Sequence, residues 1–279
     1  MNDPQTTDTH PLADRRERLA ETYKNGWGRV QEYEEAMRWR AAHPQQGSYA
    51  ASRALELPRG RLRGWFDGAK PDAVRAIETG ESHGWVDAVP GEPTFEGLSI
   101  LHAWILAGGS ISSDTFVPSF AIGPSDPVEL VRAALSAVGI PSQSVDRTSE
   151  KRAREIRPKG RGGSHLGRFL HGVLCAPVGG KTRMGAAPLQ YLDAVPQMTL
   201  LRWCQTYISL RGTSIGAAQN GPTVRLGEKR SREYQEALAA LFRGVVGADA
   251  DLTVTQRATL LGESTVTMLD HVPTLPDPS

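Results

Sequence analysis

The stretch "LHAWILAGGSIS", residues 101–112, is mostly apolar, holds a pair of glycines and contains no Asp, Glu, Lys or Arg. Its apolar run predicts a helix that ends at Gly108 and Gly109, because glycine frequently terminates helices. Helix ends in soluble proteins are usually polar, so an uncharged tip requires an explanation. The helix is either plain core or a former catalytic helix that has lost its acid.

The whole chain has 279 residues, of which 39% are hydrophobic and 23% charged, a composition typical of a soluble protein with more than one domain. No apolar run approaches the roughly 18 residues of a membrane span. The polar N-terminus lacks the apolar core of a signal peptide. Cys175 and Cys204 are the two cysteines, which favours a reducing compartment. We expect a cytoplasmic protein, nucleoid-associated if prokaryotic, with no membrane partner.

Positive charge is concentrated in one part of the sequence. Residues 147–211 hold twelve lysines and arginines and three acids, a net charge of +9, whereas the whole chain carries +1. This local concentration of positive charge is a stronger indication of a polyanion-binding surface than the total charge of the chain. A solvated basic face with acidic neighbours is the simpler alternative.

The first third of the chain predicts a small all-α domain. We place it at residues 15–86, after a disordered tail at 1–14 and before a linker at 87–97 that is rich in Pro, Gly and acids. Helical spacing of apolar residues in 29–44 and 71–85 predicts one helix on each side of a shorter helical pair.

The helical pair lies in "GSYAASRALELPRGRLRGWFDG", residues 47–68. Its apolar positions resemble those of the homeodomain-like helix-turn-helix family: Leu55, Leu57, Leu62 and Trp65. The sequence departs from that family at Glu56, where many members have glycine. The resemblance implies that the second helix enters a DNA groove. The candidate DNA-binding residues on it are Arg59, Arg61 and Arg63. A three-helix bundle with a basic rim is the alternative.

The rest of the chain repeats one order of predicted elements. Residues 98–196, with an inter-repeat link at their end, and residues 197–270 both read as helix, strands, helix, strands, and 271–279 form a tail. In the second repeat, "DLTVTQ" (251–256) and "ESTVTML" (263–269) are predicted strands. We therefore expect an α+β protein, with an all-α domain followed by a tandem duplication.

The duplicated part resembles the LAGLIDADG homing endonuclease family. In the first repeat the residues that match the name-giving motif are Leu101, Ile105, Ala107 and Gly109. The second motif would be "CQTYISLRG", 204–212, where Ile208 and Gly212 match. The resemblance covers about residues 97–270. It implies two αββαββ repeats in one pseudo-dimeric monomer, which reads double-stranded DNA through its strands.

In that family each motif helix delivers an acid from its tip to a metal beside the scissile phosphate. The resemblance places Gly108 and Arg211 at those two positions. Glycine offers no ligand, and arginine repels a metal but suits a phosphate. We therefore expect a protein that is not an enzyme, with no catalytic residue, no metal and no cofactor. Asp114 is the nearby acid that a shifted geometry would use.

Basic residues of the two repeats are the expected DNA contacts. Segment 147–168 alone holds eight Lys/Arg against two Glu. The candidates are Arg147, Lys151, Arg152, Arg154, Arg157, Lys159, Arg161, Arg211, Arg225 and Lys229, with Arg230 next to the last. Phosphate contacts of this kind supply affinity, and base contacts among them supply specificity.

These features predict a sequence-specific double-stranded DNA-binding protein, a transcription regulator built on a catalytically inactive homing-endonuclease fold. The transcription machinery is a second expected partner. The alternatives are an active LAGLIDADG homing endonuclease or RNA maturase, and a protein-interaction module. Two weaker patterns are set aside: "GGKT", 179–182, lacks the preceding strand of a phosphate-binding loop, and His171 with Cys175 lacks a further pair of metal ligands.

Overall fold

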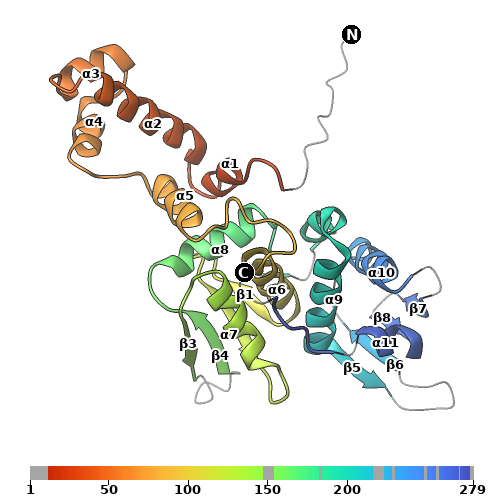
Figure 1. Cartoon of the computed structure of the whole chain (residues 1–279). Helices are drawn as coiled ribbons and strands as arrows, with labels where there is room; N and C mark the ends of the chain where they lie inside the picture. Colours follow the sequence, from red (N-terminus) through yellow and green to blue (C-terminus); the bar gives the residue numbers. More distant parts are fainter. Residues whose placement is uncertain are drawn as a thin grey trace, which may run out of the picture.

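The structure is a computed structural model. It describes residues 12–146, 154–181, 184–215, 223–227, 230–247, 250–255, 258–269 and 271–276. Figure 1 shows an N-terminal helical part that projects from a larger body containing two sheets. Among the described residues, no helix is both long and apolar enough to cross a membrane.

The N-terminal part consists of helices. They are α1 (Arg15–Ala20), α2 (Gly26–Ala42), α3 (Ser48–Leu55), α4 (Arg59–Phe66) and α5 (Asp72–Ser82). Helix α4 packs on α2, where the ring of buried Trp65 meets Tyr33 edge-on with centroids 5.4 Å apart. In the turn between α3 and α4, Glu56 has φ 56°. This left-handed conformation favours glycine. The helical pair forms as predicted, and its assignment to the helix-turn-helix family stays a prediction.

The larger body contains the same order of elements twice. The first set is α6 (Pro93–Ala107), β1 (Gly109–Ile111), β2 (Pro118–Ile122), α7 (Val128–Ala137), β3 (Ser142–Val145), β4 (Arg154–Pro158) and α8 (Gly162–Gly172). After the 3₁₀ helix η2 (Ala187–Ala194), the second set is α9 (Gln197–Arg211), β5 (Gly212–Ile215), β6 (Thr223–Gly227), α10 (Arg232–Val246), β7 (Leu252–Val254), β8 (Ala258–Leu261) and α11 (Glu263–Leu269). Both sheets are antiparallel, with the orders β1-β2-β4-β3 and β5-β6-β8-β7. The matching orders confirm an α+β fold with a duplicated unit.

A glycine follows each of the two central helices, α6 and α9. A Cβ atom on Gly109 would lie 2.8 Å from the carbonyl oxygen of Ser119, and one on Gly212 would lie 2.7 Å from that of Ile208. Real Cβ atoms are not found this close to backbone atoms. At Gly109 the close atom belongs to the neighbouring strand β2, and at Gly212 it belongs to the last turn of α9, so both positions require glycine.

Helices α6 and α9 pack against each other and bury polar groups between them. Trp203 Nε1 donates a hydrogen bond to His102 Nδ1 at 3.1 Å. Burial lowers the pKa of His102 to about 3, so the ring is neutral at physiological pH. The fully buried Glu96 accepts a hydrogen bond from Thr199 and pairs with Arg202 at 3.4 Å. Because an unpaired buried polar group is costly, this network favours one register of the two helices.

Two expected elements differ from the prediction. The linker expected at 87–97 is shorter, because α6 begins at Pro93. Residues 263–269, expected to be a strand, form α11 and bury Thr265, Val266 and Leu269. β8 lies earlier in the sequence and pairs with both β6 and β7. The β-branched residues of 263–269 favour a strand locally, but the spacing of the buried positions is that of a helix.

Both ends of the chain make contacts that the sequence did not predict. The tail expected at 1–14 includes Leu12, which is buried, while residues 1–11 lie outside the described residues. In the C-terminal tail, Pro273 is buried and Leu275 packs against the core.

Candidate nucleic-acid interface

Helices pack on one face of each sheet. In the first sheet, α7 and α8 pack on the face that carries Phe120 and Ile156, both fully buried. In the second sheet, α10 and α11 pack on the face of Leu226 and Leu261. Successive strand residues point to opposite sides, so alternate residues form the other face. We call these other faces open face 1 and open face 2. Open face 1 consists of Ser110, Ser119, Ala121, Gln143, Val145, Glu155 and Arg157. Open face 2 consists of Thr213, Ile215, Thr223, Arg225, Thr253, Ala258 and Leu260.

A polar row crosses open face 1 beside the end of α6. Ser110 pairs with Ser119, and Gln143 pairs with Arg157. Arg157 Nε lies 3.4 Å from the Ser119 hydroxyl. Arg157 also forms an ion pair with Glu155 on the same strand, at 2.6 Å. The carboxylate therefore offsets much of the charge that the sequence assigned to Arg157, and open face 1 is polar more than basic.

Other predicted contacts near β4 lie elsewhere. Arg154 shares its strand side with buried Ile156, so its side chain starts from the helix-covered face and is exposed at the end of the strand. Arg154 and Arg157, both expected to contact DNA, therefore lie on opposite faces of the first sheet. Lys159 and Arg161 are exposed between β4 and α8. The described residues do not include Arg147, Lys151 and Arg152.

Open face 2 carries a corresponding row. Its arginine lies on β6, which corresponds to β2 and not to β4, the strand that carries Arg157. The row is Thr213, Arg225, Leu260 and Thr253. Arg225 is exposed between buried Val224 and Leu226. Because the strand orders match, Arg225 on β6 corresponds to Ser119 on β2. Lys229 lies outside the described residues.

The two central helices end at equivalent positions of the repeats. Gly108 directly precedes the first residue of β1, and Arg211 directly precedes the first residue of β5. Gly108 is exposed, and nothing lies within 4 Å of the place where its Cβ would stand. Arg211 is the half-buried last residue of α9. The paired tips therefore present a glycine and an arginine.

Two cations from distant parts of the chain cap the end of α6. Lys181 Nζ donates hydrogen bonds to the carbonyl oxygens of Ile105 and Gly109. Arg230 donates to the carbonyl of Leu106 at 2.9 Å and to that of Lys181 at 3.1 Å. The last carbonyls of a helix lack intrahelical partners and carry partial negative charge, so cations stabilise this end. Arg230, grouped by sequence with the DNA contacts, belongs to this cap.

The arginines predicted on α4 differ in their surroundings. Arg61 donates to Glu32 on α2 at 2.7 Å, and its guanidinium lies 5.8 Å from the centroid of the Trp65 ring. Arg61 therefore stabilises the contact between α4 and α2. The side chain of Arg63 is 78% exposed, and Arg59 is exposed in the first turn. Arg59 and Arg63 are thus the arginines of α4 that a partner can reach.

The remaining sequence candidates for metal or catalysis are separated from the helix tips. Asp114 is exposed in the β1–β2 loop and accepts a hydrogen bond from Ser113 at 3.1 Å. A strand rises about 3.3 Å per residue, so β1 carries this loop away from Gly108. His171 and Cys175 hydrogen-bond to other groups. Within the described ranges, no three His, Cys, Asp or Glu side chains form a group able to hold a metal ion.

Comparison with known proteins finds similarity among solved structures. No family model matches the sequence, and no curated protein matches it. The chain is similar to a solved structure described as "Crystal structure of the N-terminal LAGLIDADG domain of DUF199/WhiA", with a TM-score of 0.41 and 10% sequence identity, over 71% of this chain and 92% of that chain. A TM-score below 0.5 is too low to carry an argument. The duplicated fold rests instead on the two matching strand orders of this chain.

Proposed function

We propose that this protein binds double-stranded DNA sequence-specifically and regulates transcription, on a homing-endonuclease-like fold that does not cleave DNA. The observation that carries the proposal is the pair of open faces. Each is crossed by a polar row that includes one arginine, Arg157 or Arg225, and each begins at the end of a central helix. Neither helix ends in an acid.

The chemistry of the open faces suits a nucleic acid. Serine, threonine and glutamine side chains offer donors and acceptors to base edges and phosphates, and arginine binds guanine or phosphate in a bidentate way. Two-stranded ribbons and sheets are known readers of DNA grooves. Open face 2 also carries Leu260 and the 40% exposed Ile215, and open face 1 carries Val145. Polar and charged side chains still form most of both faces, which favours a nucleic acid over an apolar partner protein.

The helix tips support binding without hydrolysis. A metal-dependent nuclease needs carboxylates to hold the ion that activates water. At the equivalent tips stand Gly108 and Arg211, and Lys181 and Arg230 add positive charge at the end of α6. This electrostatic environment attracts a phosphate and disfavours a bound cation.

A salt titration of the full-length chain tests the proposal. The affinity for a duplex should fall steeply as salt rises, because bound phosphates release counterions. Arg225→Gln should reduce the magnitude of the log–log slope by about 1, the value for one phosphate contact. The control is Arg132→Gln on α7, an arginine on the helix-covered side whose side chain is 38% exposed. It should leave the slope unchanged.

Selection from random duplexes tests specificity. A sequence-specific reader should enrich one motif, and crosslinking in the source cells should find that motif near promoters. A folded protein with no affinity for duplexes at low salt would contradict DNA binding and favour the protein-interaction alternative. Enrichment without any promoter association would leave DNA binding intact but contradict transcription regulation.

A further inference from the structure

The N-terminal helices are carried on the side of the first sheet opposite open face 1. Helix α8 packs on the covered face, where a Cβ on Gly163 would lie 2.8 Å from Pro158 Cβ. Helices α1 and α5 pack in turn on α8, and α2 packs on both of them. Figure 1 shows this stack, with α2–α4 at its outer end. The sheet, α8 and the α1/α5 layer therefore separate α4 from open face 1.

Polar and aromatic contacts fix α1 and the β1–β2 loop to α8 and its neighbours. Arg168 of α8 places its guanidinium 3.9 Å from the ring centroid of Tyr23 and 3.8 Å from that of Phe116. Tyr23 follows α1, and Phe116 lies in the β1–β2 loop. Trp85 after α5 donates through Nε1 to the carbonyl of Val138 at 2.9 Å. These contacts hold the N-terminal helices against the first repeat.

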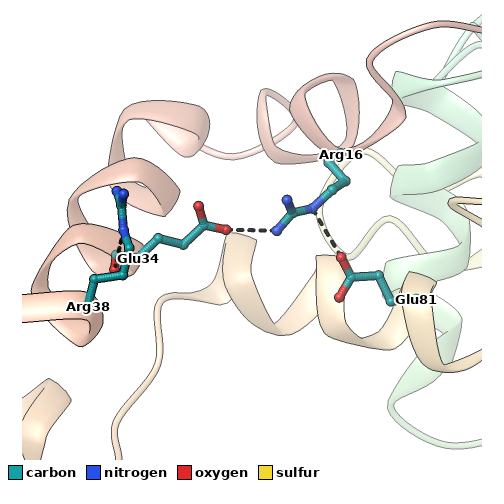
Figure 2. Close-up of polar contacts among 4 residues, drawn as sticks. All are labelled: Arg16, Glu34, Arg38 and Glu81. Carbon is teal, nitrogen blue, oxygen red and sulfur yellow. Dashed lines mark hydrogen bonds and ion pairs between the residues drawn. The ribbon is translucent and has the colours of Figure 1, made fainter. Parts of the chain in front are cut away.

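Packing on α1 and α5 sets the direction in which α2 leaves this stack, and two ion pairs follow the same contacts. Arg16 of α1 lies between two carboxylates, 2.7 Å from Glu34 of α2 and 3.0 Å from Glu81 of α5 (Figure 2). One arginine therefore joins three helices. The side chains in both pairs are 42% exposed, so the pairs contribute little and add to the packing of α2 on α1 and α5.

From this geometry we infer that one monomer holds two DNA duplexes at once, one on the open faces and one on α4, and so bridges separate DNA segments. This inference rests on the proposed DNA binding. The exposed arginines of α4, Arg59 and Arg63, are separated from open face 1 by the first sheet, α8 and the α1/α5 layer, each about 10 Å thick. Arg225 lies on open face 2, which would bind the same duplex as open face 1. A single duplex would have to bend around the body to touch both α4 and the open faces, which costs bending energy. Two duplexes avoid this cost.

A bridging assay on the full-length chain tests the inference. One duplex is immobilised on beads, and a second, fluorescent duplex is free in solution. The wild-type protein should retain the free duplex on the beads, and sedimentation should give the mass of one chain with two duplexes. Variants Arg59→Ala/Arg63→Ala and Arg225→Ala should each still bind one duplex but lose at least tenfold in bridging. The matched control is Arg75→Ala, an exposed arginine on α5 that lies on neither surface.

The possible outcomes separate the two proposals. Complexes of one chain with one duplex, in which both variants weaken affinity for that same duplex, would overturn bridging while leaving DNA binding intact. Bridging by protein dimers that hold one duplex each would overturn it as well. No duplex binding in either assay format would overturn both proposals. Circular dichroism of each variant confirms that a loss of bridging does not come from unfolding.

Discussion

Arg230 donates a hydrogen bond to the carbonyl oxygen of Leu106 at 2.9 Å, across 124 positions of sequence. The contact joins the second repeat to the end of the central helix of the first. It also answers the question raised by the uncharged tip of that helix. The tip has no charged residue of its own, and a lysine and an arginine from later segments place positive charge there.

This cap predicts that Arg230→Ala destabilises the protein. The substitution removes hydrogen bonds from a charged donor to helix carbonyls, so we expect a loss of about 1.5–3 kcal/mol in the free energy of unfolding, measured by urea denaturation. The control is Arg232→Ala, whose exposed pair with Glu236 lies within α10. An exposed pair of this kind is worth about 0.5 kcal/mol or less. Equal losses in the two variants would contradict the cap.

The arginines of α4 should separate stability from DNA affinity. Arg61→Ala removes the ion pair with Glu32 and the contact with Trp65, so it should lower the stability of the α2–α4 part by about 1 kcal/mol. Arg63→Ala should leave stability within about 0.5 kcal/mol and weaken binding to a selected duplex by about 1–3 kcal/mol. Thermal unfolding and fluorescence anisotropy measure the two quantities. An unchanged affinity of the Arg63 variant for its best site would argue against reading by α4.

His102 should make the protein sensitive to acid. The pKa of His102 is about 3 in the folded chain, because burial disfavours the charged ring, and about 6.5 when unfolded. Below pH 6.5 the unfolded chain therefore binds more protons. The stabilising effect of the neutral ring is complete above that pH and is lost as pH falls toward 3. The expected slope is up to about 1.4 kcal/mol per pH unit.

Urea titrations at pH 7, 5.5 and 4.5 measure this slope. His102→Gln retains an acceptor for Trp203 but does not titrate in this range, so its slope should be flatter than that of the wild type. The control is His271→Gln at an exposed position, which should keep the wild-type slope. A wild-type slope in the His102 variant would show that other groups cause the acid sensitivity.

Sequence periodicity predicted the order of elements where each segment has one clear pattern. Helix α2 covers most of the segment expected at 29–44, and α3 and α4 lie within the helical pair expected at 47–68. Both repeats also keep the expected order of helix, strands, helix and strands. Prediction failed at α11, where Thr265 and Val266 favour a strand locally but packing on α9 and α10 selects a helix. Local sequence does not contain that packing.

The candidate site was less predictable than the fold, because side-chain partners come from distant segments. From the charge pattern alone, Arg157 and Arg61 were expected to contact DNA in the same way as the exposed arginines. In the structure, Glu155 pairs with Arg157 and Glu32 pairs with Arg61. Lys181 was visible only as part of a "GGKT" pattern, and its partners lie 72 and 76 residues away. The position along a strand also decides on which face of the sheet a side chain lies. Arg154 and Arg157 are three residues apart, so they start from opposite faces of β4.

The wild-type protein should not cleave DNA with Mg²⁺ or Mn²⁺, even on its best binding site. A hydrolytic metal site needs carboxylates, and the two equivalent helix tips offer Gly108 and Arg211. Gly108→Asp should fold normally, because nothing lies within 4 Å of the new Cβ. It should still not nick a supercoiled plasmid, since one carboxylate at a helix end capped by Lys181 and Arg230 does not supply the carboxylate set that a hydrolytic metal ion needs.

The double variant Gly108→Asp/Arg211→Asp extends this test. It places two negative charges against the phosphates, so its affinity for duplex DNA should fall and its salt dependence should flatten relative to the wild type. The control is Asp114→Asn, which should leave affinity and the absence of nicking unchanged, because Asp114 stands in the β1–β2 loop, away from the tips. Metal-dependent nicking by the purified wild-type protein, abolished by Asp114→Asn, would contradict the proposal that the helix tips are catalytically inactive. The protein would then be an active nuclease.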